Sequence, residues 1–568
     1  MEAVPAEVRP DIVPREEWIA PPTDPEDERV EVGVAIVGGG PGGLACALRL
    51  TQLLEEEPAL RDELGDVPVA LVEKGRSAGS HLLSGAIMRP SALEALLPDV
   101  PRGEWPTYGE VHADAAYLLT PRRAVRFPRT PPPFRNEGNH VVSVARLARW
   151  LAARAEEAGV YVLPETVAAK LLVEDGEVRG VRTGDKGRGR QGEELGRFEP
   201  GSDLVARATV LAEGAQGHLS AAALDRFGLA SADPLQWELG VKEVWEVPRG
   251  LDRVIHTLGW PLRTAARYRE FGGSWLYPMG HDTVSVGFVA GLDYRDATFS
   301  VHDALQELKT HPFVRGVLEG GTRVAWGAKT IPSGGYWAMP KLWAPGLCLV
   351  GDAVGMVNVP QLKGIHYAMH AGMLAAEAIV EALKAGSTRD LSGYERRVRG
   401  SAIERDLHRS RNMRQPFARG FLVGGALANA MELTGGRFPG GHWRTHDDAA
   451  VPVFVGDRRP VTPDGALTFD KLSSVYLTGN ATRDDAPNHL RVQARVPLPV
   501  GLMWQSMCPA QVYEVPDEEI ERARGDGHGA LVDVRVTPAN CVQCGAITAK
   551  GGRLTPPEGG DGPNYQLT

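Results

Sequence analysis

The stretch "VGVAIVGGGPGGLACALRLTQLLEE", residues 32–56, decides the fold of this chain. It begins as an apolar strand, turns at a run of glycines, and continues as a helix with apolar positions at Leu44, Leu48 and Leu53. A second apolar strand, "VPVALVEKG", follows at residues 67–75. A strand, a helix and a strand within about forty residues predict a βαβ unit with parallel strands.

The glycines of this turn form a G-x-G-x-x-G motif at Gly38, Gly40 and Gly43. The first glycine permits the tight turn, the second lets a pyrophosphate approach the backbone, and the third allows close helix–strand packing. The helix N-terminus then favours the phosphate charge. Glu73 ends the next strand, where a carboxylate can accept a hydrogen bond from a ribose hydroxyl. The motif and its context therefore predict a dinucleotide site.

A second contact to the nucleotide is expected about three hundred residues later. There "GLCLVGDAV" predicts a strand that ends at Gly351 and Asp352 and leads into a helix. Asp352 is placed to bind a ribityl hydroxyl, and "LAEGAQG" at residues 211–217 supplies a further glycine turn. Contacts from such distant segments suit the longer cofactor, so we expect FAD rather than NAD.

Composition narrows the class of protein. The 568 residues are 43% apolar and 24% charged, as in a soluble globular protein of several domains. The net charge of −10 argues against nucleic-acid binding, and five cysteines are too few for a disulfide framework. The N-terminus lacks the pattern of a secretory signal, and no apolar run is long enough to span a bilayer.

Three of the five cysteines lie near the C-terminus, in "MCPAQVYEV" (residues 507–515) and "NCVQCGAITAKGG" (residues 540–552). Cys508, Cys541 and Cys544 are spaced as ligands of an iron–sulfur cluster, which usually takes four thiolates. Ile547 stands where the fourth is expected. Cys46 and Cys348 belong to a helix and a buried strand and cannot replace it. Three outcomes stay open: a three-iron cluster, a four-iron cluster with a non-cysteine ligand such as Asp561 or His528, or no cluster.

With these motifs in hand, the chain resembles the electron-transfer-flavoprotein:ubiquinone oxidoreductases from about residue 34 to residue 565. The resemblance rests on "HLLSGAIMRP", "HTLGWPL", "FGGSWLYPMG", "VGFVAGLDY", "HPFVRGVLEGG", "NVPQLKGIH", "CPAQVYEV" and "PEGGDGPNY", which occur in the order of the family. Members of the family are monotopic membrane flavoproteins with one FAD and one [4Fe–4S] cluster. They accept electrons from an electron-transfer flavoprotein and pass them to quinone.

The resemblance implies the roles of particular residues, and no catalytic acid, base or nucleophile is among them. The cofactor residues it implies are Val37, Gly38, Gly39, Gly40, Pro41, Gly42, Gly43, Leu44, Glu73, Ser84, Gly85, Glu213, Gly214, Gly351, Asp352 and Gly364. Gly272 and Gly273 would bind quinone, because a missing side chain exposes backbone groups to a flat ring. Cys508, Cys541 and Cys544 would hold the cluster.

The expected fold is mixed α/β (α+β). A glutathione-reductase-like, FAD-binding Rossmann domain carries an inserted antiparallel-sheet quinone domain and a C-terminal ferredoxin-like module. The expected segments are an N-terminal arm (1–30), the two parts of the FAD-binding domain (31–234 and 336–400), the quinone-binding sheet (235–335), a membrane-surface helical segment (401–450) and the iron–sulfur-type domain (451–568).

Contact with the membrane is expected at residues 417–436, "FARGFLVGGALANAMELTGG", flanked by Arg414, Arg419 and Arg437, with residues 123–134 as a second contributor. An apolar face with arginines at the headgroups is typical of interfacial segments. We therefore expect a monotopic protein on the cytoplasmic face of the inner membrane, with electron-transfer flavoprotein, membrane quinone and the membrane surface as partners.

Two other functions stay open. One is an FAD-dependent prenyl-chain reductase or hydroxylase of the same broad fold, which would not need the cysteine-bearing tail. The other is a non-catalytic docking subunit that keeps FAD for structure, with the incomplete cysteine set as its signature.

Overall fold

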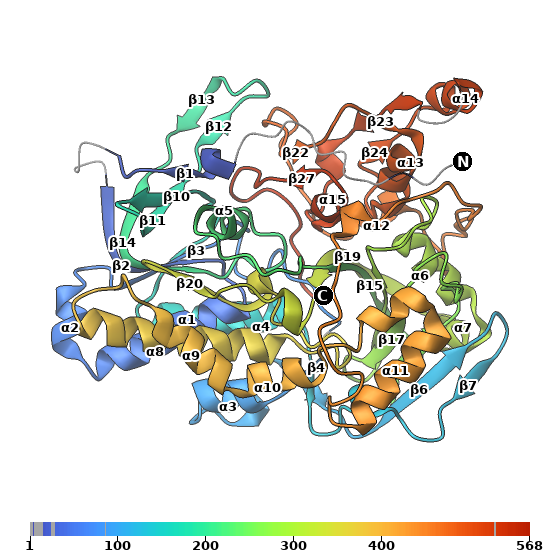
Figure 1. Ribbon diagram of the computed structural model, residues 1–568, viewed down its shortest axis with the longest axis horizontal. Helices are drawn as coiled ribbons and strands as arrows, with labels where there is room; N and C mark the ends of the chain where they lie inside the picture. The colour runs from blue at the N-terminus through green and yellow to red at the C-terminus, as the bar shows by residue number, and fades with distance from the viewer. Residues whose placement is uncertain (1–3, 5–14, 24–28, 86, 527–529) are drawn as a thin grey trace.

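The computed structural model describes residue 4 and residues 15–23, 29–85, 87–526 and 530–568. Within these residues the larger layer is a nine-stranded sheet (Figure 1). Its main path runs β1 (Ile19–Ala20), β10 (Ala168–Glu174), β11 (Glu177–Thr183), β14 (Asp203–Leu211), β2 (Arg29–Val37), β3 (Val69–Val72) and β9 (Tyr161–Leu163). Off this path, β21 (Leu347–Leu349) pairs with β14 and with β20 (Trp343–Ala344).

Parallel pairing of β2 with β3 and β14 forms the centre of this sheet. The predicted βαβ unit is present: β2, α1 (Pro41–Glu55) and β3 follow one another, with the short α2 (Pro58–Glu63) between α1 and β3. β2 is buried from Val32 to Val37 because helices cover the sheet, as is typical of parallel strands.

Helices α1, α4 (Val144–Glu157) and α8 (Ile365–Lys384) lie below the sheet in Figure 1, with α3 (Ser91–Leu96), α9 (Ser392–Gly400) and α10 (Ala402–Arg409) beyond them. α1 and α8 approach each other closely. A Cβ on Gly372 of α8 would lie only 2.2 Å from the carbonyl oxygen of Gly42 in α1. Ser143 caps α4 by accepting a hydrogen bond from the amide of Arg146 at 3.2 Å.

The second layer is a seven-stranded sheet in the order β19 (Thr322–Pro332), β15 (Trp237–Glu246), β18 (Thr283–Gly291), β17 (Gly272–Pro278), β16 (Val254–Gly259), β6 (Asp114–Leu119) and β7 (Ala124–Arg126). α6 (Val301–Thr310) and α7 (Pro312–Leu318) accompany it. Most pairs are antiparallel, as expected, but β16 and β6 are parallel. β6 and β7 come from residues that we had placed in the first part of the FAD-binding domain.

The C-terminal region consists of short helices and three two-stranded sheets. Its elements are α12 (Lys471–Tyr476), β22 (Leu490–Arg491), β23 (Arg495–Pro497), α13 (Leu498–Met507), β24 (Tyr513–Glu514), α14 (Asp517–Asp526), β25 (Leu531–Asp533), β26 (Arg535–Val536), α15 (Ala546–Ala549) and β27 (Arg553–Leu554). The mixed α/β fold with a separate C-terminal module is confirmed. Most of the N-terminal arm falls outside the described residues, and the segment boundaries stay predictions.

The last residues of the chain run back across both sheets. The Tyr565 hydroxyl accepts from the amide of Ala328 on β19 at 3.2 Å, and the Tyr565 amide donates to the carbonyl of Ser80 at 2.9 Å. At the end of the chain, the carbonyl of Thr568 accepts a hydrogen bond of 3.0 Å from the Ser143 hydroxyl that caps α4. The C-terminal tail is therefore an integral part of the structure around β2 and β3.

Candidate functional site

The glycine turn between β2 and α1 has the three roles that its spacing predicts. Gly38 has a φ of +110°, and a Cβ on it would lie 2.4 Å from the carbonyl oxygen of Ala212. A Cβ on Gly43 would lie 2.1 Å from the carbonyl oxygen of Gly38, so this position packs the helix against the turn. A Cβ on Gly40 would meet nothing nearer than Leu82, at 4.0 Å. Glycine at the first and third positions avoids a clash with neighbouring carbonyl oxygens, while glycine at the second leaves room for a ligand.

The N-terminus of α1 is open toward that room. Gly40 is its N-cap and Pro41 its first residue, so no side chain caps the first amide groups. Gly40, Pro41 and Gly42 all line one large cavity. A helix end that faces a cavity in this way suits the phosphates of a dinucleotide.

Glu73 follows β3 and holds this turn together. Its Oε2 accepts a hydrogen bond from the amide of Gly39 at 2.8 Å, and its Oε1 accepts from the amide of Gly75 at 2.6 Å. Each carboxylate oxygen has two lone pairs, so both oxygens retain capacity for a ribose hydroxyl. The role in stabilising the turn was not evident from the sequence.

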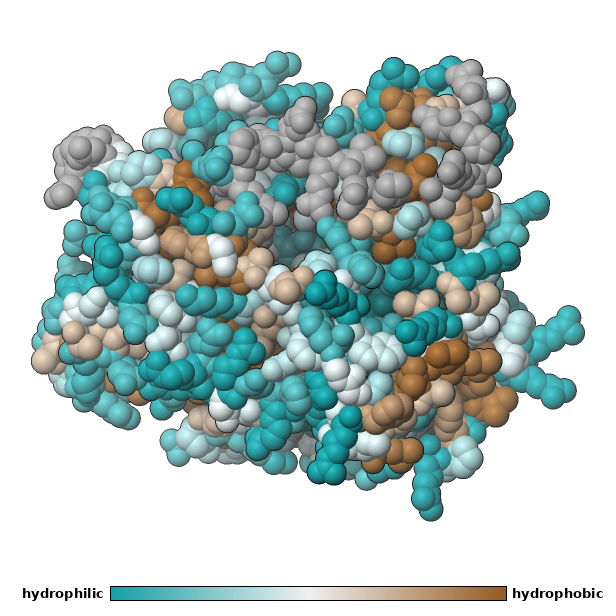
Figure 2. All heavy atoms as spheres, in the orientation of Figure 1, coloured by the Kyte–Doolittle hydropathy of each residue, from teal (hydrophilic) through white to brown (hydrophobic). Residues whose placement is uncertain are grey.

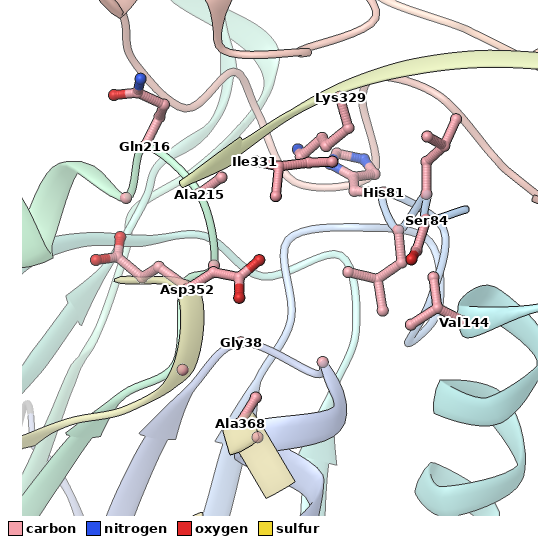
Figure 3. A pocket seen from close by; sticks show the side chains of 18 of the residues that line it. Gly38, His81, Ser84, Val144, Ala215, Gln216, Lys329, Ile331, Asp352 and Ala368 are labelled. Atoms are coloured by element: carbon pink, nitrogen blue, oxygen red, sulfur yellow. The ribbon is translucent and has the colours of Figure 1, made fainter. Parts of the chain in front are cut away.

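The cavity has a volume of about 300 Å³ and extends from the glycine turn to the second sheet (Figure 3). All of the cofactor residues expected from the sequence line it except Gly39, Gly43 and Leu44. Segments that are far apart in the chain, around residues 38–42, 213–217 and 351–352, thus meet at one site, as the FAD prediction requires. Their individual contacts with a cofactor stay predictions.

Asp352 and Lys329 are two oppositely charged residues in the lining of this cavity. Asp352 lies on the short 3₁₀ turn η6 (Gly351–Val354), and burial raises its pKa to about 6 although Lys329 opposes the shift. Burial lowers the pKa of Lys329 to about 8, with Lys74 adding to the effect. Figure 3 shows Lys329 and His81 on one side of the cavity and Asp352 on the other. Lys329 was missed in the sequence because nothing in β19 marks it as a cavity residue.

Glu213 anchors α5 (His218–Arg226) beside the cavity. Its carboxylate accepts from the amide of Ser220 at 2.6 Å and lies 3.3 Å from Nδ1 of His218. Burial raises the pKa of this carboxyl, but the hydrogen bonds and charge of His218 and the hydrogen bonds of Ser220 outweigh burial and lower it. The residue is therefore an ionised support for the loop that forms one wall of the cavity.

One part of the cavity wall is aromatic and apolar. It includes Trp275 and Tyr277 of β17, Val289 of β18, and Leu362 from the loop before α8. Side chains on alternate positions of a strand share a face, which explains why Trp275 and Tyr277 both reach the cavity. This wall was not predicted, because it depends on the packing of two distant sheets.

The three cysteines of the C-terminal module surround a separate, small cavity. Cys508 follows α13, while Cys541 and Cys544 lie just before α15. The full lining is Leu490, Met507, Cys508, Ala510, Val512, Tyr513, Cys541, Val542, Cys544, Gly545, Ala546, Ile547 and Leu554. Within the described part of the chain this lining holds no Asp, Glu or His, and no three His, Cys, Asp or Glu side chains are grouped closely enough to hold a single metal ion.

The sulfurs of this cysteine cavity receive backbone hydrogen bonds. The Val512 amide donates to Sγ of Cys508 at 3.4 Å, and the Gln543 amide donates to Sγ of Cys541 at 3.3 Å. Burial raises the pKa of the Cys544 thiol to about 12, so bound iron would have to displace the thiol protons. Backbone donors of this kind also tune the potential of a cluster. Three thiols around one cavity are the donor chemistry of iron–sulfur clusters, so the residues present suit a cluster rather than a single metal ion.

The cysteine cavity and the large cavity adjoin. Leu554 lines both, and Gln543, between Cys541 and Cys544, connects their walls. Lys74 Nζ donates to Oε1 of Gln543 at 2.9 Å, and Lys329 Nζ donates to its carbonyl oxygen at 3.1 Å. The cysteine loop is therefore bonded directly to the strands that form the large cavity.

Comparison with known proteins agrees with this arrangement. Three family models match: "ETF-QO, ubiquinone-binding" at residues 237–331, "Electron transfer flavoprotein-ubiquinone oxidoreductase, 4Fe-4S" at residues 465–566, and "FAD binding domain" at residues 89–235. The electron transfer flavoprotein-ubiquinone oxidoreductase of Pseudomonas aeruginosa is 37% identical over 95% of this chain and 99% of its own length. The mitochondrial protein of Caenorhabditis elegans is 36% identical over 96% of this chain and 94% of its own length.

The chain belongs to the electron transfer flavoprotein-ubiquinone oxidoreductase family. Among solved structures, a geranylgeranyl bacteriochlorophyll reductase-like protein from Thermoplasma acidophilum shares the fold, with a TM-score of 0.53 and 20% identity over 72% of this chain and 92% of its own. A likeness at that identity concerns the fold alone.

Ile547 stands at the position where the resemblance implies a fourth cysteine. Its side chain lines the cysteine cavity and is buried. It also packs tightly against Gly552, where a Cβ would lie 2.5 Å from its Cγ1. Asp561, considered above as a substitute ligand, is not in the lining, and His528 lies outside the described residues. The expected fourth ligand position is thus filled by hydrocarbon.

The two glycines implied to bind quinone lie at the start of β17, outside the lining of the large cavity. A Cβ on Gly272 would lie 2.0 Å from the carbonyl oxygen of Val289, and one on Gly273 would lie 2.7 Å from that of Thr257. Close packing of neighbouring strands therefore accounts for glycine at both positions. Their contact with quinone stays a prediction.

The predicted membrane segment forms an exposed apolar helix, α11 (Phe421–Leu433), after the 3₁₀ turn η7 (Gln415–Arg419). Leu422 is 81% exposed and Leu433 is 88% exposed. Figure 2 shows the resulting apolar patch over α11, and Figure 1 places β7, within the second predicted segment, on the same side of the molecule. Arg419 and Arg437 are exposed as expected, but Arg414 is buried. Among the described residues no helix is long and apolar enough to cross a membrane.

Proposed function

We propose that this chain is an FAD enzyme that takes electrons from an electron-transfer flavoprotein and reduces quinone at a membrane surface. Family membership over nearly the whole chain supports the reaction. The observation that carries the proposal is the large cavity, which joins a dinucleotide cradle to an aromatic wall and adjoins the cysteine cavity. No other arrangement of the described residues joins these three features.

The residues that line the large cavity suit successive parts of the FAD molecule. The open N-terminus of α1 at Gly40 would hold the pyrophosphate, and Glu73 would accept from the ribose. Asp352 would accept from the ribityl chain. FAD, when bound, supplies the electron transfer chemistry, and the protein sets its position, potential and access.

Lys329 adds positive charge to the wall of the cavity. With a pKa of about 8 it remains mainly protonated at neutral pH, and its Nζ is fixed by the carbonyl of Gln543. A fixed cation in a buried site stabilises negative charge that develops nearby. Lys329 would therefore favour the reduced form of the cofactor and raise its potential.

Quinone would bind against the aromatic wall. Trp275 and Tyr277 would contact a flat quinone, and Val289 and Leu362 would exclude water. Gly272 and Gly273 precede these aromatics on β17 and would act through the position of that strand, in addition to the contacts that the family resemblance implies.

The membrane part of the proposal rests on α11. In its thirteen residues only Gly424 and Met431 are buried. We propose that this face rests among the acyl chains of the bilayer, so that the protein is monotopic on the cytoplasmic face of the inner membrane. Residues 123–134 would add a second contact, because β7 lies on the same side of the molecule (Figure 1).

A spectroscopic assay tests the reaction. The purified protein should be yellow, lose its flavin colour when reduced electron-transfer flavoprotein is added, and regain it when a quinone is added. The control is the same protein with NADPH in place of the flavoprotein partner. Bleaching by NADPH but not by the flavoprotein would favour a prenyl-chain reductase or hydroxylase. A flavin that responds to neither donor would favour a docking subunit.

A further inference from the structure

A third cavity, which we call the arginine cavity, lies beside α11. It is formed by η7, the segment at residues 443–446 and two residues of the second-sheet region. Its lining is Gln236, Arg269, Arg414, Gln415, Ala418, Arg419, Trp443, Arg444, Thr445 and His446. Within the described residues this lining contains four guanidinium groups and no carboxylate. Such a lining suits an anion and excludes the hydrocarbon tail of a quinone.

One carboxylate behind the lining compensates part of this charge. Asp293 accepts from both terminal nitrogens of Arg414, at 3.1 and 2.6 Å, and lies 3.3 Å from Arg269. Two further acids, Glu238 and Asp448, are buried near Arg414, and burial raises the pKa of both, which reduces the negative charge they contribute. Two arginines therefore share mainly one ionised partner.

The other two arginines have no carboxylate against them in the described part of the chain. Arg419 lies over the ring of Trp443, at 4.9 Å, and both Arg419 and Arg444 are exposed at the mouth. Deeper in the cavity, Nε of Arg269 and Nε of Arg414 are buried without a hydrogen-bond partner. A buried donor without an acceptor is costly, and an anion with several oxygens would satisfy these donors together.

The position of the cavity indicates the source of that anion. η7 supplies part of the lining and leads through Gly420 into α11, whose exposed leucines face outward. When α11 rests among acyl chains, the cavity mouth lies at the level of the headgroups. The Oε1 atom of Gln415 is also buried without a donor, which a headgroup hydroxyl would supply.

We propose that the arginine cavity binds the phosphodiester headgroup of an anionic phospholipid with a hydroxylated headgroup, such as a phosphatidylglycerol. This inference rests on the membrane location in the proposed function. Bound in this way, one lipid orients η7 and α11 on the bilayer and ties them, through Arg414 and Asp293, to β18.

Binding of a soluble lipid analogue tests the site without a membrane. Dihexanoyl-phosphatidylglycerol is titrated into full-length protein below its critical micelle concentration, followed by calorimetry. We expect one saturable site per chain. The Arg419→Gln/Arg444→Gln variant should bind about tenfold more weakly, since two charge-assisted contacts are lost. The matched control, Arg437→Gln/Arg267→Gln, removes the same charge from exposed positions outside the lining and should bind within about twofold of the wild type.

Equal weakening in both double variants, or no saturable binding, would overturn the proposal. Inorganic phosphate and dihexanoyl-phosphatidylcholine are titrated in parallel. Phosphate that binds as tightly as the anionic lipid would identify a free anion as the ligand and overturn the lipid source. Equal binding of the two lipids would show that the cavity does not select an anionic headgroup. Sedimentation with neutral vesicles reports separately on α11, so loss of the membrane location is distinguishable from loss of this site.

Discussion

Removal of the two most exposed leucines of α11 should release the protein from membranes. The change is Leu422→Asn together with Leu433→Asn, which retains much of the side-chain volume and adds no charge. Both side chains are exposed, at 81% and 88%, so they make few contacts within the fold. Lower helix propensity should cost about 0.5 kcal/mol of stability at each position, so the variant stays folded.

The size of the effect follows from these exposures. Full burial of a leucine contributes about 2 kcal/mol. Scaled by the exposed fractions of 81% and 88%, the two side chains would contribute together about 3.4 kcal/mol if both enter the acyl region. This corresponds to about a 300-fold weaker partition into the bilayer. Phe421 and Leu427 are half-buried, so substitution there would also disturb packing.

The assay is co-sedimentation with vesicles over a range of lipid concentrations. A matched control is Leu472→Asn/Tyr476→Asn on α12, where the side chains are exposed at 47% and 85% but lie outside the patch. This control should partition like the wild type. An α11 variant that partitions as strongly as the wild type would refute α11 as the membrane contact, and equal losses in both variants would refute the localised patch.

Three other predictions concern the cavities. Gly40→Val should abolish flavin binding and retain the fold, since the new side chain enters open space. Flavin absorbance measures the binding and circular dichroism measures the fold, and full flavin occupancy in this variant would contradict the assignment. After exposure to air the protein should contain at most about three iron atoms per chain, because an iron without a protein ligand is labile, and Ile547→Cys should give a more stable cluster. Iron and sulfide analysis with electron paramagnetic resonance on anaerobically purified protein checks this, and a stable four-iron centre in the wild type would mean an unrecognised ligand. Burial raises the pKa of Glu238 to about 7. The group therefore stabilises the folded state below its unfolded pKa, and this stabilisation is lost as the pH rises through 7. Glu238→Gln should remove this part of the pH dependence of thermal unfolding, and an unchanged pH profile would show that Glu238 does not cause it.

The sequence predicted the cradle of the large cavity well because local rules govern it. The periodicity of residues 32–56 and the spacing of Gly38, Gly40 and Gly43 determine a strand, a turn and a helix whatever the rest of the chain does. The exposure of α11 was also suggested by its composition, since no covering element was evident in the sequence.

The other walls could not be predicted because they depend on contacts between distant residues. The sequence around Lys329 indicates a β-strand and nothing more. The role of Lys329 depends on Gln543, which lies more than two hundred residues later in the chain. Trp275 and Tyr277 reach the cavity only through the packing of two sheets. Arg414 was placed at the membrane from its position in the sequence, but Asp293 holds it inside the protein.

The C-terminal tail imposes an order on the biogenesis of this protein. β2 and its glycine turn are synthesised more than five hundred residues before Leu554, Thr555 and Pro556, which close the same cavity. Thr568, the last residue, is bonded to the cap of α4. During synthesis the large cavity therefore stays open until residues 554–556 have been made. A truncation before Leu554 would yield a long product in which the large cavity lacks this part of its wall.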